Sequence, residues 1–284
     1  MRRILVLQAL AAMLLAAACS AELSPGATVL QSISETNDAG SARVAYSAIF
    51  DIAAAEGPVG MSGEGVFDYA HQRGRMTFDM SEILRGAEGA PSGAGEVEMI
   101  FDGTVLYMKM PFLTELVADE RPWIRLDLEA ARRAGRADLA QLVQLGESDP
   151  TQLLELLHGA ERGVDDVGTE EVRGESTTHY KMTVDLPRAA AKASDEARSS
   201  VDALIARSRS DDLVAEVWID GEGRMRKMIY GVDLGESDAA ADERNTMTVS
   251  MELYEFGVDV LVEPPPPGEV IDLLQLIDQP QGTS

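Results

Sequence analysis

Three histidines, a single cysteine and 49 acidic residues are the side chains of this 284-residue chain that could do chemistry. His71, His158 and His179 are isolated, and none has a second histidine at the spacing of a zinc site. A Gly-Glu-Ser tripeptide recurs, but it never continues to the Gly-x-Ser-x-Gly turn that exposes a catalytic serine. No two carboxylates stand out as a general acid and base. The sequence therefore predicts no enzyme, no catalytic residue, no metal site and no cofactor.

Cys19 directly follows a short apolar run near the N-terminus. Two arginines precede this run, residues 4–18, which has the profile of a secretory signal peptide and is too short to cross a bilayer comfortably. The run ends in three alanines before the cysteine, which resembles a bacterial lipoprotein signal, although Ala16 stands where most members have leucine. We expect residues 1–18 to be removed and Cys19 to carry two or more acyl chains, as a stable anchor requires. The alternative is a plain secreted protein in which Cys19 is incidental.

The remainder of the chain is strongly acidic and has no second long apolar run. The formal net charge of the whole chain is -25, which repels phosphate backbones and anionic headgroups and argues against nucleic-acid binding. Membrane contact then depends on the acylated Cys19 or on apolar surface. We expect a tether over residues 19–27, one domain over 28–272 and a flexible tail over 273–284.

Period-two alternation of apolar and polar residues dominates the domain and predicts an antiparallel sheet with inserted helices. There are roughly eleven strand candidates. They lie near residues 42–52, 65–69, 75–80, 96–101, 104–110, 123–126, 163–167, 178–186, 213–219, 225–234 and 246–256.

The clearest hairpin lies over residues 96–110, because Asp102-Gly103 is the dipeptide that a type I′ turn prefers. A two-residue loop at this dipeptide places Met99 opposite Leu106, Val97 opposite Met108, and Glu96 opposite Lys109. Apolar residues then meet on one face and opposite charges on the other, which stabilises a strand pair.

Four helical segments are expected around the strands. The first is 28–35, the second 127–145, and the third begins with Asp149-Pro150 as its N-terminal signal and covers 151–157. The fourth, Pro187 to Ser208, has a narrow apolar stripe suited to lying across a sheet.

Methionine is abundant, with 13 in the chain, and most of those after Cys19 lie on strand candidates. Its flexible, polarisable side chain adapts to irregular apolar partners. The same periodicity is expected when the face simply packs on the helices as an ordinary core, and this is the commoner role of such a face. The residues that share faces are Met76, Phe78 and Met80; Val97, Met99 and Phe101; Leu106, Met108 and Met110; Tyr180, Met182 and Val184; and Met247, Val249 and Met251.

An ordered set of segments resembles the LppX/LprG-type lipoproteins of actinobacteria, which are similar in fold to the LolA/LolB lipoprotein carriers. The set runs from the lipoprotein signal through DGTVLYMKMP, Trp123 with IRLDL, DPTQLLELL and DVGTEEVRGESTTHYKMTVDL to AEVWIDGEGRMRKM and YEFGVDVLVEPPP. It covers residues 28 to 272.

The resemblance implies an α+β fold, a half-open antiparallel β-barrel wrapped around helices, with an apolar cavity for lipid acyl chains. It implies a lipid or glycolipid ligand carried or presented at the cell envelope, on the extracytoplasmic face of the membrane. The cavity-lining candidates are then Met76, Phe78, Met80, Val97, Met99, Phe101, Leu106, Met108, Met110, Met182, Val184, Met247, Val249 and Met251, with the helix from Pro187 to Ser208 as lid or floor. The alternative is a closed-core interaction module, a scaffold or sensor with an envelope protein as partner.

Overall fold

The computed structural model describes residues 23–52, 57–85, 95–111, 121–136, 156–159, 163–208, 210–237 and 240–278. The predicted signal peptide and Cys19 lie outside these residues. So do most of the third expected helix and the second half of the one expected over 127–145. No helix within the described ranges is long and apolar enough to cross a membrane.

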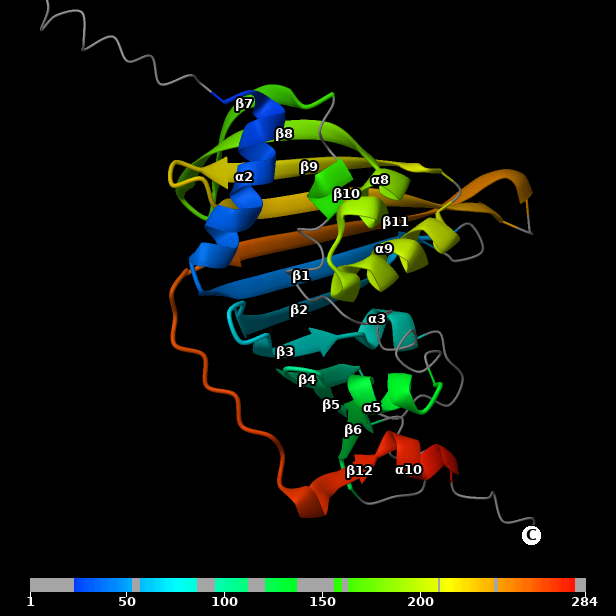
Figure 1. Cartoon of the computed structure of the whole chain (residues 1–284). Helices are drawn as coiled ribbons and strands as arrows, with labels where there is room; N and C mark the ends of the chain where they lie inside the picture. The colour runs from blue at the N-terminus through cyan, green and yellow to red at the C-terminus, as the bar shows by residue number, and fades with distance from the viewer. Residues whose placement is uncertain are drawn as a thin grey trace, which may run out of the picture.

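A single twelve-stranded sheet forms the body of the molecule (Figure 1). Its order is β12-β6-β5-β4-β3-β2-β1-β11-β10-β9-β8-β7. The strands are β1 (Ser41–Asp51), β2 (Val59–Asp68), β3 (Arg73–Asp79), β4 (Glu96–Asp102), β5 (Val105–Lys109), β6 (Trp123–Asp127), β7 (Asp165–Val172), β8 (Glu175–Asp185), β9 (Asp212–Asp220), β10 (Met225–Ser237), β11 (Ala240–Tyr254) and β12 (Val270–Asp272).

The sheet is open, because its two edge strands in the described part of the chain, β7 and β12, do not pair with each other. All eleven predicted strands are present, and the half-open antiparallel arrangement with inserted helices is confirmed. One expectation needs correction: the twelfth strand, β12, was not predicted, and it pairs with β6 in parallel. A three-residue strand is too short to produce an alternating pattern that the sequence could reveal.

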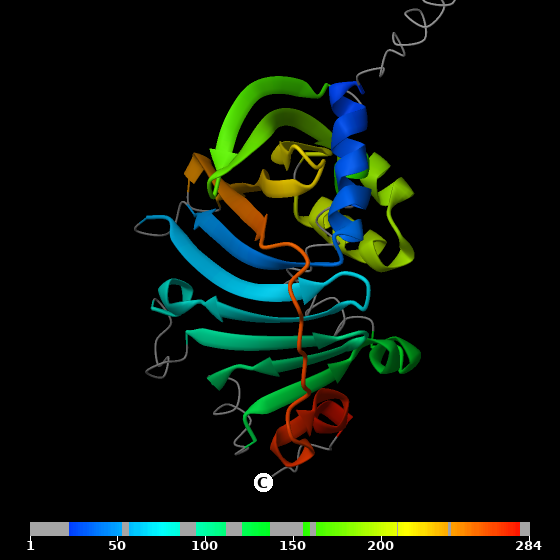
Figure 2. The ribbon, with the colours of Figure 1, turned by 90° about the vertical axis from the view of Figure 1, so that its left-hand side faces the viewer.

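The main helices lie on the concave side of the curved sheet (Figure 2). They are α2 (Pro25–Asp38), η1 (Leu156–Gly159), α8 (Leu186–Lys192) and α9 (Asp195–Arg207), and they cover the half that contains β8–β11. Thr36 fixes α2 there, because its buried hydroxyl accepts a hydrogen bond from the backbone of Met225 at 2.9 Å. The shorter helices α3 (Ser81–Leu84) and α5 (Leu128–Arg133) adjoin the other half.

The predicted helix from Pro187 to Ser208 is in fact two helices. Helix α8 ends before Ala193, which has an extended backbone, and Ser194 begins α9 by accepting a hydrogen bond from the Ala197 amide at 3.3 Å. The apolar stripe continues across this break, because Ala190, Ala193, Ala197 and Val201 are all buried. Periodicity therefore revealed the buried face but not the bend.

Both ends of the expected domain also differ from the structure. Helix α2 begins at Pro25, within the segment expected to be a tether, and continues to Asp38. Residues 273–278, expected to start the flexible tail, form α10 (Leu273–Asp278), and Leu273 and Leu274 pack against the core.

The hairpin of β4 and β5 has a different register from the predicted one. Met99 faces Met108, Phe101 faces Leu106, and Glu98 rather than Glu96 faces Lys109. The loop is Gly103-Thr104, with the positive φ of 61° at its first residue, where a type II′ turn requires glycine. The observed partner of each residue lies two positions along the other strand from the predicted one. A shift of two residues keeps every side chain on the same face, so the prediction of the apolar face is correct although the register is wrong.

Candidate functional site: the inner face of the sheet

The candidate site is the inner face, which we define as the side of the sheet that carries the buried residues beneath the helices. Paired residues on neighbouring strands share a face, so the register places these side chains in rows across the sheet. One row runs from Ile124 through Met108, Met99 and Met76 to Gly65, Val44 and Leu253. A second runs from Val97 through Phe78, Gly63, Tyr46, Met251, Met228 and Val217 to Tyr180. Both rows consist almost entirely of apolar residues.

All fourteen predicted lining residues lie on this face and belong to or pack against one hydrophobic cluster. Eleven of them are buried, and none of these residues is more than 7% exposed: Met76, Phe78, Val97, Met99, Phe101, Leu106, Met108, Met182, Val184, Val249 and Met251.

Met80, Met110 and Met247 are half-buried and share one end of the sheet. At this end β1, β3 and β5 finish and β11 begins, as the pairing of Phe50 with Met247 and of Asp79 with Glu96 shows. Phe50 and Met61, also half-buried, accompany them. Half-buried apolar side chains thus gather at this end of the inner face.

Inner-face pairs between β2 and β3 combine a glycine with a large side chain. Gly65 pairs with Met76, Gly63 with Phe78, and Gly74 with Phe67. A Cβ on Gly63 would lie 2.5 Å from the Phe78 ring, so the large side chain occupies the space above its glycine partner. The glycines therefore let aromatic and methionine side chains lie flat on the inner face.

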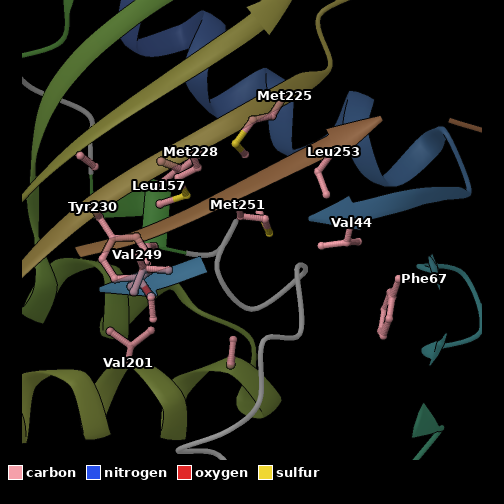
Figure 3. Packing of buried hydrophobic residues seen from close by; sticks show 14 of the residues in the cluster. Val44, Phe67, Leu157, Val201, Met225, Met228, Tyr230, Val249, Met251 and Leu253 are labelled. Carbon is pink, nitrogen blue, oxygen red and sulfur yellow. The ribbon is translucent and has the colours of Figure 1, made fainter. Parts of the chain in front are cut away.

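Strand β10 brings residues to the site that the sequence analysis did not assign. Met228, Tyr230 and Val232 alternate on the inner face and are buried. Figure 3 shows Tyr230 and Val249 pointing from the sheet toward Val201 of α9. The signal was available, because residues 225–234 were predicted as a strand whose alternation places these three side chains together.

Tyr230 introduces a phenol into this apolar layer. Burial raises its pKa well above the ordinary value for tyrosine, and the nearby Tyr46 phenol adds to the increase. The side chain is therefore neutral and a hydrogen-bond donor throughout the pH range in which proteins are folded.

The opposite, outer face is polar and charged. Glu98 accepts hydrogen bonds from Lys109 and Arg75, each at 2.7 Å, and these partners hold its pKa below the usual range against the effect of burial. A cavity of about 610 Å³ over β1–β4 has a mixed lining, in which the carboxylates of Glu64, Asp79 and Glu96 accompany Tyr46, Gly63 and Phe78 of the second row. Three carboxylates in the lining make it a poor site for an acyl chain.

The isolated histidines do not come together in the part of the chain that the structure describes. No three His, Cys, Asp or Glu side chains within that part are grouped as metal ligands. His71 lies beside Asp68, while His179 stacks on Trp218 and lies between Glu170 and Glu216. These contacts belong to the charged outer surface of the sheet.

Comparison with known proteins gives structural similarity only. No protein-family model and no curated protein sequence matches the chain. The crystal structure of the Mycobacterium tuberculosis lipoprotein LppX aligns with 83% of this chain and 98% of its own, at 18% identity and a TM-score of 0.46. LprF from Mycobacterium bovis aligns with 85% of this chain and 98% of its own, at 13% identity and a TM-score of 0.47.

A LolA superfamily protein from Nitrosomonas europaea aligns with 84% of this chain and 96% of its own, at 9% identity and a TM-score of 0.27. LppX and LolA are the types that the sequence segments resemble. The residues of this chain themselves build the candidate site, which is the apolar inner face.

Proposed function

We propose that this chain is a membrane-anchored lipoprotein without enzymatic activity that binds lipid acyl chains against the inner face and carries or presents them at the cell envelope. The observation that supports the proposal is the extent of the inner face. Apolar side chains continue in rows from β6 to β8 and include many buried methionines. Methionine suits such a role because it can repack around ligands of different shape.

Burial of an acyl chain supplies enough free energy for this function without nucleotide or metal. Each buried CH₂ contributes about 0.8 kcal/mol, so a chain of ~16 carbons offers roughly 12 kcal/mol before ordering costs are subtracted. We propose that a ligand enters at the end of the inner face where Met80, Met110 and Met247 are half-buried.

Native mass spectrometry before and after organic extraction tests lipid binding. We expect the purified protein to carry near-stoichiometric lipid, and Met99→Trp with Met108→Trp to abolish it, because two indoles fill the central row. Thr77→Trp is the matched control, because Thr77 adjoins Met76 but is exposed on the outer face; it should keep the lipid.

A closed-core interaction module is the second candidate. The near-complete burial of eleven of the fourteen lining candidates favours it, since a filled core needs no ligand. A single ligand-free mass for the wild-type protein, with no uptake of added phospholipid or glycolipid, would reject the carrier and leave this module.

Membrane attachment through Cys19 has its own test. We expect the wild-type protein in the membrane fraction of its host, labelled by a radioactive fatty acid, and Cys19→Ser in the soluble fraction without label. An unlabelled wild-type protein in the culture medium would support the plain secreted alternative.

A further inference from the structure

The connecting segment, residues 255–269, joins β11 to β12 along the surface of the molecule (Figure 2). Its start is fixed, because Ser41 donates a hydrogen bond to the Val258 carbonyl and accepts one from the Gly257 amide. Over residues 259–265, no backbone group forms a hydrogen bond with another residue in the part of the chain that the structure describes. Side-chain packing and the two fixed ends therefore hold this stretch in place.

Side chains of the connecting segment alternate between the protein and solvent. The three valines at the even-numbered positions from 258 to 262 are half-buried, whereas Asp259, Leu261 and Glu263 are exposed. Leu261 is 80% exposed, the highest fraction among the large apolar side chains of the described residues. A single exposed leucine is ordinary on a protein surface. This one stands directly before a run of four prolines, which changes what it can do.

The prolines at 264–267 fix the conformation of the backbone after Leu261. A proline sets its own φ near about -65° and keeps the residue before it out of the helical region, so residues 263–266 are restricted to extended or polyproline II backbone. Pro266 has φ -55° and ψ 134°, which is polyproline II geometry. Pro265 is buried, while the other three prolines are exposed. The chain thus presents one side of a preorganised polyproline II stretch to solvent.

The charge around this stretch restricts what can cover it. Asp259, Glu263 and Glu269 are exposed, and residues 255–269 contain no lysine or arginine. An anionic membrane surface or a second copy of this chain, with its net charge of -25, would meet these carboxylates with like charge. Grooves lined by aromatic side chains recognise polyproline II segments, because such a segment is already ordered and loses little entropy on binding. Basic residues beside such a groove would complement the three carboxylates.

We propose that residues 259–267 are the docking site for another protein, which holds Leu261 and the exposed prolines in an aromatic-lined groove with lysine or arginine at its rim. Docking requires no rearrangement of the sheet, because the segment is held at both ends. The inference does not depend on lipid binding at the inner face, which lies on other residues.

Site-specific photo-crosslinking in the host cell, followed by affinity measurement, tests the docking site. The full chain carries benzoylphenylalanine at position 261 or, as the matched control, at position 49, because Ile49 is also exposed, at 49%, but lies on the outer face of β1. We expect position 261 to give an adduct with one other protein that position 49 does not give. That protein is then identified, purified and titrated with the wild-type chain and its variants.

Leu261→Ala should weaken the affinity about tenfold or more, as loss of an interface anchor does, and replacement of Pro264 and Pro266 by alanine should weaken it likewise. Ile49→Ala should bind as wild type does. Glu263→Gln should weaken binding most at low salt, since it removes one charge pair. A synthetic peptide of residues 257–269 should compete with the wild-type chain for the purified partner.

An absent adduct at position 261, adducts only between two copies of this chain, or unchanged affinity in Leu261→Ala would each overturn the proposal. The urea midpoint of Leu261→Ala should equal that of wild type, so that lost binding is not lost folding. Native mass spectra should show the same lipid content in all variants. Lipid loss in wild type would count against the proposed function, and loss of docking alone against this inference.

Discussion

At the scale of single residues, the methionines of the inner face contribute to stability whatever they bind. Met76 is fully buried, with 0% exposed. We expect Met76→Ala to lower the free energy of unfolding by about 2–5 kcal/mol, because it removes buried surface and leaves a cavity. Urea denaturation measures this loss. Leu261→Ala is the control, since Leu261 is 80% exposed and should change stability by less than about 0.5 kcal/mol.

Asp220 makes stability depend on pH. Burial opposes its ionisation, but Arg226 at 2.7 Å and Arg224 at 3.0 Å outweigh this and hold its pKa below the usual value. A lowered folded-state pKa stabilises the protein above the unfolded pKa of about 4 and loses this effect as the pH falls through the folded value.

Asp220→Asn should therefore cost about 3–5 kcal/mol at pH 7, since it leaves the buried Arg226 without its counter-charge. The difference from wild type should shrink below about pH 4. Urea denaturation across pH checks both statements. Asp259→Asn, on an exposed residue, is the control; a pH-independent loss in Asp220→Asn would contradict the assignment.

The faces of individual residues could be predicted from the sequence, because alternation determines them without reference to partners. Met99 and Met108 were placed on the correct face even though their predicted register was wrong. The surroundings of Tyr230 could not be predicted, since they depend on which residues of β9, β11 and α9 pack around it.

At the scale of elements, glycines control how β2 and β3 pack. A Cβ on Gly65 would collide with the Arg75 carbonyl oxygen and lie 2.9 Å from the Met76 Cα. Both are backbone atoms, which cannot move aside alone. We expect Gly65→Ala to destabilise the protein by about 1–3 kcal/mol or more in thermal or urea unfolding.

Gly231→Ala in β10 is the matched control, since no atom lies within 4 Å of its Cβ position. It should be neutral or stabilise by up to about 1 kcal/mol. Similar losses in both variants would show that steric crowding at Gly65 is not the cause.

Strand positions were predictable because each strand repeats its pattern over several residues. The break between α8 and α9 was not, because Ala193 and Ser194 are compatible with a helix interior and tertiary packing decides the bend. The hairpin turn was misplaced by one residue because Asp102-Gly103 and Gly103-Thr104 both satisfy a two-residue loop.

At the scale of the whole molecule, the segment between β11 and β12 joins the middle of the sheet to its edge. Figures 1 and 2 show it passing the ends of β1–β6. Ser41 holds its start by donating a hydrogen bond to the Val258 carbonyl at 2.5 Å. At its far end Asp272 accepts a hydrogen bond from Arg125 at 2.7 Å and another from the Leu274 amide at 3.1 Å.

Asp272→Ala should therefore loosen β12 and α10 without unfolding the rest. We expect faster amide hydrogen exchange in 270–278 and unchanged exchange in β9. Glu263→Ala, an exposed position in the same segment, should leave both regions unchanged. Protection in 270–278 equal to that of wild type would show that Asp272 does not fasten this edge.

This long-range organisation was the least predictable part from residues alone. The pairing of β1 with β11 and of β6 with β12 joins segments about 150 or more positions apart, for which no local pattern gives a signal. The open sheet with covering helices came from the resemblance of ordered segments, whereas β12 depends on where the prolines at 264–267 deliver the chain.

Photo-crosslinking tests the central claim, that the inner face binds acyl chains, most directly. The protein is loaded with a phosphatidylethanolamine whose acyl chain of ~16 carbons bears a diazirine at its middle. It is then irradiated, and the adducts are mapped by peptide mass spectrometry. We predict adducts on inner-face residues such as Met99, Met108 and Met228, lost when Met99 and Met108 are both tryptophan. Adducts confined to the outer face, or none above the level of unfolded protein, would contradict the account.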